Sequence, residues 1–171
     1  MATVANEQQA MDTPKRRQPK IRGNGCPCVC CGGAPADIDV RKIANNGGKW
    51  IQLKDGRIVE YYVYGATNPD SKVFLMVTGY MCSAFGFTKN PPLVDLLQEN
   101  NIKGISVNVP GHGGSSNYPL RRMWEYGKID VAQVLKAEGV PGDAPLMIEG
   151  SSFEAAHAFS LLSAFSDLKR D

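Results

Sequence analysis

The chain has 171 residues, of which 43% are hydrophobic and 21% are charged, and its formal net charge at pH 7 is +2. This length suits one domain with a substantial core, and so small a charge gives no sign of a nucleic-acid-binding protein. No apolar run approaches the roughly 20 residues that span a bilayer, and residues 1–8 lack the apolar stretch of a secretory signal. We therefore expect a cytoplasmic protein whose five cysteines are reduced thiols.

Residues 1–48 show neither helical nor strand periodicity, and they contain many Gly and Pro residues. Because such a composition breaks both kinds of element, we predict a disordered tail over 1–48, followed by a domain over 49–171. The tail holds a basic run and then a cluster of cysteines, namely Lys15, Arg16 and Arg17 followed by Cys26, Cys28, Cys30 and Cys31.

The cysteine cluster has several interpretations. Its spacing is too tight for the paired ligands of a structural zinc site, and a soft-metal clip is a weak alternative, so we predict no metal and no cofactor. Cysteines beside a basic run suit S-acylation, and the two signals together would attach the chain to a membrane surface. The alternative to membrane attachment is a disordered tail whose thiols are exposed to solvent.

Regular patterns begin near residue 50. Two β-rich runs, 50–53 and 58–64, flank an Asp55-Gly56 pair, which predicts a β-hairpin. Hydrophobic periodicity then predicts strands over 73–77, 105–109 and 146–148, the last one buried, and helices over 93–99, 121–137 and 153–165. The inward positions expected on the first two helices are Leu93, Leu96 and Leu97, and Val131, Val134 and Leu135.

The alternation of strands and helices sets the fold class. It implies parallel pairing through right-handed crossovers, so we predict an α/β fold with a mostly parallel sheet, an N-terminal antiparallel hairpin and helices on both faces. The far side of strand 146–148 would be an open sheet edge. With Phe159, Leu162 and Phe165 on the following helix, this edge predicts self-association.

The residues after strand 146–148 carry the main functional signal. Residues 150–154 read Gly-Ser-Ser-Phe-Glu and precede an alanine-rich helical pattern. A serine on a sharp strand-to-helix turn is typical of a nucleophile elbow, G-x-S-x-G, in which Ser152 would be the nucleophile. Glu154 stands where the motif has its closing glycine. The simpler interpretation is that Ser152 caps the following helix.

Two further landmarks precede this motif in order. Thr78-Gly79-Tyr80 follows strand 73–77, and Pro-Gly-His-Gly-Gly-Ser over 110–115 follows the next strand. With the opening hairpin, the region from 50 to 171 resembles the N-terminal half of an α/β-hydrolase, which has His-Gly-x at the first landmark and Pro-Gly-His-Gly-x-Ser at the second.

The resemblance implies a serine hydrolase of ester or other acyl substrates. Ser152 would attack the substrate, and the backbone N–H groups of Tyr80 and Phe153 would form the oxyanion hole. Neither His112 nor His157 matches the family's catalytic histidine, so we expect a truncated sequence that lacks the triad histidine and acid. The alternative is a non-catalytic α/β-hydrolase-like protein that serves in binding or interaction.

Overall fold

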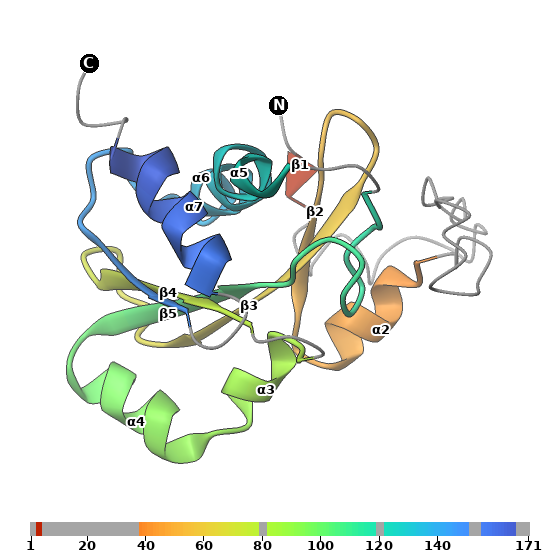
Figure 1. Cartoon of the computed structure of the whole chain (residues 1–171). Helices are drawn as coiled ribbons and strands as arrows, with labels where there is room; N and C mark the ends of the chain where they lie inside the picture. The colour runs from red at the N-terminus through yellow and green to blue at the C-terminus, as the bar shows by residue number, and fades with distance from the viewer. Residues whose placement is uncertain (1–2, 5–37, 79–81, 119–121, 151–154, 167–171) are drawn as a thin grey trace.

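The computed structural model describes residues 3–4, 38–78, 82–118, 122–150 and 155–166. Strands of these segments form one mixed sheet in the order β1-β2-β3-β5-β4-β6 (Figure 1). The strands are β1 (Thr3–Val4), β2 (Lys49–Gln52), β3 (Ile58–Gly65), β4 (Lys72–Val77), β5 (Ile102–Val107) and β6 (Leu146–Gly150). The helices are α2 (Val40–Asn45), α3 (Phe85–Thr88), α4 (Pro91–Glu99), α5 (Met123–Glu125), the π-helix η1 (Tyr126–Val131), α6 (Ala132–Ala137) and α7 (Ala155–Ser166).

The sheet joins an antiparallel part to a parallel part. β1, β2, β3 and β5 pair antiparallel in turn, whereas β4 lies parallel to both of its neighbours, β5 and β6. The predicted hairpin is formed by β2 and β3. In its turn Gly56 has a φ of +86°, which glycine adopts without strain, and the Leu53 N–H donates to the Arg57 carbonyl at 2.8 Å. The predicted α/β fold class is confirmed.

Helices cover both faces of this sheet (Figure 1). α3 and α4 pack on one face, where they bury Tyr62, Tyr64 and Leu97. The segment from α5 to α6 and helix α7 pack on the other face, over a core that includes Tyr126 and Leu161. The carboxyl ends of the parallel strands are therefore left for loops rather than for helices.

The helix predicted over 121–137 is present over Met123–Ala137, but it is not a regular α-helix, because the π turn η1 lies between α5 and α6. The hydroxyl of Tyr126, at the start of this turn, donates to the Val107 carbonyl of the sheet at 2.8 Å. The same turn carries Asp130, whose Oδ1 lies 3.0 Å from Nη1 of the buried Arg57 side chain. The predicted inward positions, Val131, Val134 and Leu135, are indeed buried.

Two predictions from the sequence are wrong, one about the buried face of α4 and one about the limits of β5. Leu96 is 57% exposed, because α4 turns Leu97 rather than Leu96 fully toward the sheet. The strand predicted over 105–109 spans Ile102–Val107, because the chain leaves the β5 ladder before Asn108.

Strand β6 is parallel, as predicted, but it is not buried. It forms the edge of the described sheet, and Met147 is 41% exposed. At the other end of the sequence, β1 and α2 lie within residues 1–48, where no ordered element was expected. The Asp39 side chain caps α2 by accepting a hydrogen bond from the Arg41 N–H at 3.1 Å. Residues 5–37 lie outside the described part.

Candidate functional site

The carboxyl ends of β4, β5 and β6 meet at one edge of the sheet. In the parallel register Val77 of β4 is paired with Val107 on one side and with Gly150 on the other. Open α/β sheets bind their ligands beyond the carboxyl ends of parallel strands. The three loops that the sequence singled out all begin at this edge.

The predicted catalytic residues lie outside the described residues; they are Ser152, Tyr80 and Phe153. Their flanks are described. β6 ends at Gly150 and α7 begins at Ala155, so residues 151–154 connect a parallel strand directly to a helix. A strand, a short connection and a helix form the context in which a nucleophile elbow occurs. The roles of the three residues stay predictions.

A buried glutamate on β3 organises the neighbouring part of this edge. Glu60 is 4% exposed, and its carboxylate accepts a hydrogen bond from the Tyr62 hydroxyl at 2.7 Å. It accepts two more, from the side-chain amide of Asn108 and from the Gly114 N–H. These three donors are uncharged, and together they satisfy both buried oxygens of the side chain.

Asn108 extends this network to the loop that follows β4. Its Oδ1 accepts a hydrogen bond from the Ala84 N–H at 2.7 Å, while its Nδ2 donates to Glu60. Ala84 lies shortly after residues 79–81, which include Tyr80. Glu60 and Asn108 therefore fix the described end of the loop that would carry one of the two oxyanion donors.

The Pro-Gly-His-Gly-Gly-Ser loop is tied to the hairpin strand β3. Ser115 Oγ accepts a hydrogen bond from the Glu60 N–H at 3.0 Å, and Ser116 Oγ accepts one from the Ile58 N–H at 2.8 Å. Gly113 has a φ of +54°, and a Cβ there would collide with the Glu60 carboxylate. The glycine and the two serines thus let this loop close tightly over β3.

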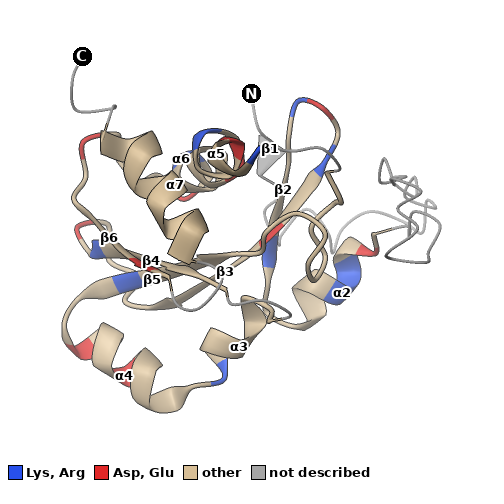
Figure 2. Cartoon of the chain, in the orientation of Figure 1, with Lys and Arg blue, Asp and Glu red and all other residues tan. Residues whose placement is uncertain are grey.

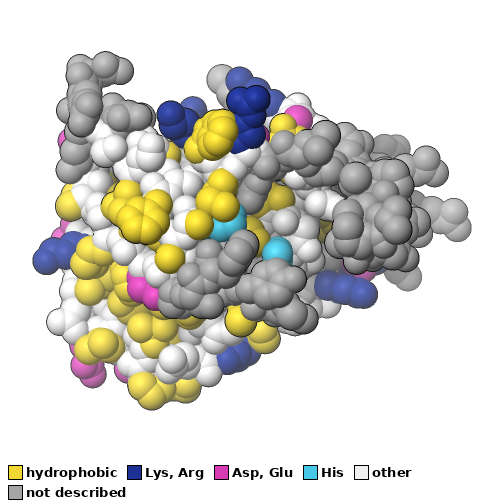
Figure 3. Space-filling view, in the orientation of Figure 1, with side chains coloured by type: hydrophobic (Ala, Val, Ile, Leu, Met, Phe, Trp, Pro, Cys, Tyr) yellow, Lys and Arg dark blue, Asp and Glu magenta, His cyan; other side chains and the backbone are white. Residues whose placement is uncertain are grey.

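The two histidines of the chain have different surroundings, although Figure 3 shows both of them on the same face of the molecule. His157 on α7 is 7% exposed, and its ring packs edge-on against Tyr126 with centroids 5.3 Å apart. His112 is half-buried, and its Nδ1 has no hydrogen-bond partner among the described residues. The sequence predicts that neither His112 nor His157 is the catalytic histidine of the family, and this stays a prediction.

Two tyrosines of β3 have raised pKa values. Burial and the hydrogen bond to Glu60 raise the pKa of Tyr62 well above its usual range. Burial raises the pKa of Tyr64 to about 12. Both phenols are therefore neutral hydrogen-bond donors near neutral pH, and neither suits the role of a general base.

Other predicted features are only partly covered by the structure. Within the described ranges, no three His, Cys, Asp or Glu side chains gather so that they could hold a metal ion. No described helix is long and apolar enough to cross a membrane. The described Lys and Arg residues are spread over several elements (Figure 2). The basic run 15–17 and the cysteine cluster 26–31 lie outside the described residues, so membrane-surface attachment stays a prediction.

Sequence analysis missed Glu60 and Asn108. One signal for the first was present, because alternate residues of a strand share a face. Ile58, Glu60 and Tyr62 lie on one face of β3, and an acidic residue between two apolar neighbours on a buried face requires a partner. Asn108 had no local signal in the sequence, because its hydrogen-bond partners come from β3 and from the loop after β4.

Comparisons with known proteins bear on the fold. No protein-family model matches the chain, and a search of curated proteins gives no match. An esterase from Rhodococcus sp. ECU1013 superposes with a TM-score of 0.52 at 28% identity, covering 69% of this chain and 41% of the esterase. A protein from Agrobacterium vitis S4 superposes with a TM-score of 0.54 at 18% identity, covering 72% and 46%.

A thioesterase domain from the curacin biosynthetic pathway is also similar, with a TM-score of 0.50 at 20% identity, covering 68% of this chain and 39% of that domain. The chain therefore spans about two fifths of the length of these solved structures. The likeness confirms the fold that the sequence predicted.

Proposed function

We propose that this chain, which has the α/β-hydrolase fold, supplies the nucleophile and the oxyanion hole of a serine hydrolase of ester or other acyl substrates. One observation carries the proposal. Val77 and Gly150 are register partners on adjacent parallel strands, so the loops that hold Tyr80 and Ser152 start side by side. Two structural neighbours, an esterase and a thioesterase domain, agree with this substrate class.

The proposed chemistry uses that juxtaposition. The Ser152 hydroxyl attacks the acyl carbon, and the negative charge that develops on the carbonyl oxygen is stabilised by the N–H groups of Phe153 and Tyr80. α7 is a twelve-residue helix that begins at Ala155. Its positive dipole end therefore lies on the side where the oxyanion would form, which favours the same step.

The network around Glu60 supports this proposal as a positioning device. An oxyanion donor is effective only when it is already aimed at the developing charge. Asn108 donates a hydrogen bond to Glu60 and accepts one from the Ala84 N–H, and these two bonds restrain the loop from its described side. The donor would then need little reorganisation when the substrate reacts.

Covalent labelling tests the proposal. We expect a fluorophosphonate probe to add to the peptide that contains Ser152, as measured by mass spectrometry of the digested chain. If neither His112 nor His157 acts as a base, as the sequence predicts, the labelling should be slow, because the oxyanion hole and binding then contribute only roughly 10³–10⁴-fold over water. Ser152→Ala should abolish the adduct, and the matched Ser151→Ala variant should retain it. An adduct that persists in Ser152→Ala would exclude Ser152 as the nucleophile.

A binding role is the second candidate, and the β6 edge favours it. The side of β6 away from β4 has no partner strand in the described part of the chain. Beside it, Phe159 and Leu162 of α7 are 70% and 51% exposed. Unpaired edges and apolar surfaces of this kind are templates for association. This candidate predicts self-association of the chain, and light scattering measures it.

A further inference from the structure

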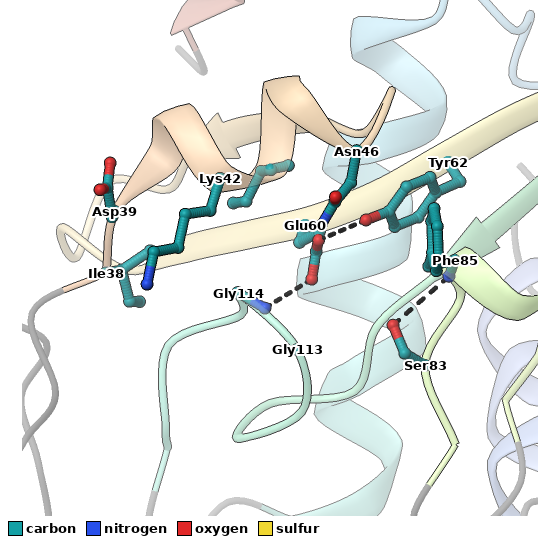
Figure 4. Close-up of a pocket in the computed structure, with 11 residues that line it drawn as sticks. Ile38, Asp39, Lys42, Asn46, Glu60, Tyr62, Ser83, Phe85, Gly113 and Gly114 are labelled. Carbon is teal, nitrogen blue, oxygen red and sulfur yellow. Dashed lines mark hydrogen bonds between the residues drawn. The ribbon is translucent and has the colours of Figure 1, made fainter.

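A cavity of about 340 Å³ opens on the hairpin side of the sheet, between α2 and β3 (Figure 4). Its volume is at the lower end of the range found for small-molecule sites. Glu60 and Tyr62 of β3, residues of α2, the loop that holds Ser83 and Phe85, and the glycine pair Gly113–Gly114 enclose it. None of these residues has a direct part in the proposed acyl chemistry, in which Glu60 serves only to position the loop after β4 through Asn108.

The cavity contains a buried carboxylate without a cationic partner. Glu60 is 4% exposed, and none of the described Lys, Arg or His side chains lies within ion-pair distance of it. Its hydrogen-bond donors are all uncharged. Buried charges in proteins are ordinarily paired, because an unpaired one costs several kcal/mol of desolvation. A cation that enters the cavity would offset this cost.

The other walls divide the cavity into two ends. Tyr62 and Phe85 lie on one side of Glu60, and Lys42 lies on the other (Figure 4). The two aromatic rings contact each other with centroids 5.7 Å apart, and Ile43 adds an apolar side chain to the lining. A cationic head beside Glu60 therefore has apolar surface next to it for a short hydrocarbon chain, at the end away from the Lys42 ammonium. The Lys89 ammonium lies 4.9 Å from the Phe85 ring centroid, but Lys89 does not line the cavity.

We propose that this cavity binds a small alkylammonium group, with the ammonium at the Glu60 carboxylate and the alkyl chain against Phe85 and Ile43. The site is independent of the nucleophile, so Ser152→Ala should bind the same ligand equally well. A charged ammonium gains charge-assisted hydrogen bonds that are about twice as strong as neutral ones. An uncharged isostere lacks this gain, and an anion is repelled.

The test uses three probes of similar size on the whole chain: n-butylammonium chloride, 1-butanol and sodium butyrate. Each is titrated at constant ionic strength while the amide shifts of Gly113 and Gly114 are followed by NMR. We expect n-butylammonium to bind roughly tenfold more tightly than 1-butanol, and butyrate not to bind. Equal affinity for the amine and the alcohol would overturn the proposal.

Two variants sharpen the test. Glu60→Gln keeps the shape of the side chain and should weaken n-butylammonium binding by roughly tenfold. Should that variant fail to fold, Lys42→Ala decides, because Lys42 is exposed and has no part in the network. Removing its like charge should strengthen n-butylammonium binding by roughly two- to fivefold. Unchanged or weakened binding in Lys42→Ala would refute the proposed placement of the ammonium.

Discussion

Two parts of the described structure differ in how their side chains are buried. In the half built from β2, β3 and β5, buried polar groups find partners across the fold, as in the Arg57–Asp130 ion pair at 3.0 Å. In the half built from β6 and α7, large apolar side chains face outward: Met147 is 41%, Phe159 70% and Leu162 51% exposed. The first half is held by internal contacts, whereas the second presents a surface whose burial against another element would be favourable.

The largest expected effect comes from breaking the internal contacts of the first half. Asp130→Ala should lower the free energy of unfolding by about 3–5 kcal/mol, because it leaves the buried Arg57 guanidinium without that partner. Urea denaturation followed by circular dichroism measures this loss.

A matched control is the second carboxylate that contacts Arg57. Asp55 lies 2.7 Å from Arg57 Nε, but its side chain is 48% exposed. Asp55→Ala should therefore cost about 1 kcal/mol or less, as exposed ion pairs do. Equal losses in the two variants would show that burial does not distinguish the two pairs.

Two adjacent leucines on α7 test the contrast within the second half. Leu161 is 1% exposed and belongs to the core, whereas Leu162 is 51% exposed. Leu161→Ala should lower the free energy of unfolding by about 2–5 kcal/mol through lost burial and a residual cavity. Leu162→Ala should change it by less than about 0.5 kcal/mol. Thermal melts of both variants check the difference, and similar melting temperatures would contradict the placement of α7.

The smallest expected effect on stability belongs to the exposed surface itself. Phe159→Lys should change the free energy of unfolding by less than about 0.5 kcal/mol. If the β6–α7 surface drives self-association, the same variant should shift the chain to monomer in light scattering. Leu96→Lys makes the same apolar-to-charged change on the opposite face of the sheet, where Leu96 is 57% exposed, and it should leave association unchanged. Association that resists Phe159→Lys would assign it to another surface.

Much of the fold could be predicted because its signals are local. The Asp55-Gly56 pair specifies the hairpin turn, and short apolar runs specify the parallel strands. Leu96 shows the limit of such reasoning. Its spacing suits the inward stripe of α4, but the helix buries only Leu97 fully, and no local pattern shows which of the two leucines packs on the sheet.

The candidate site was predicted less completely, because its order comes from distant parts of the chain. The Ser152 motif could be recognised from five consecutive residues. The Glu60 network, by contrast, joins groups that are about 50 residues apart in sequence, such as Asn108 and Gly114. Sequence periodicity indicates that Glu60 is unusual on its strand face, but only the fold shows which donors reach it.

The π turn η1 makes one helical segment tolerant of a change in length. An α-helix rotates by about 100° per residue, but a π turn takes up one extra residue without rotating the helix that follows it. A one-residue deletion within Tyr126–Val131 would therefore replace the π turn by an α turn and leave α6 in its present register. Because Tyr126 and Asp130 lie in this turn and contact the Val107 carbonyl and Arg57, such a deletion would disturb these two local contacts and not the packing of the whole segment.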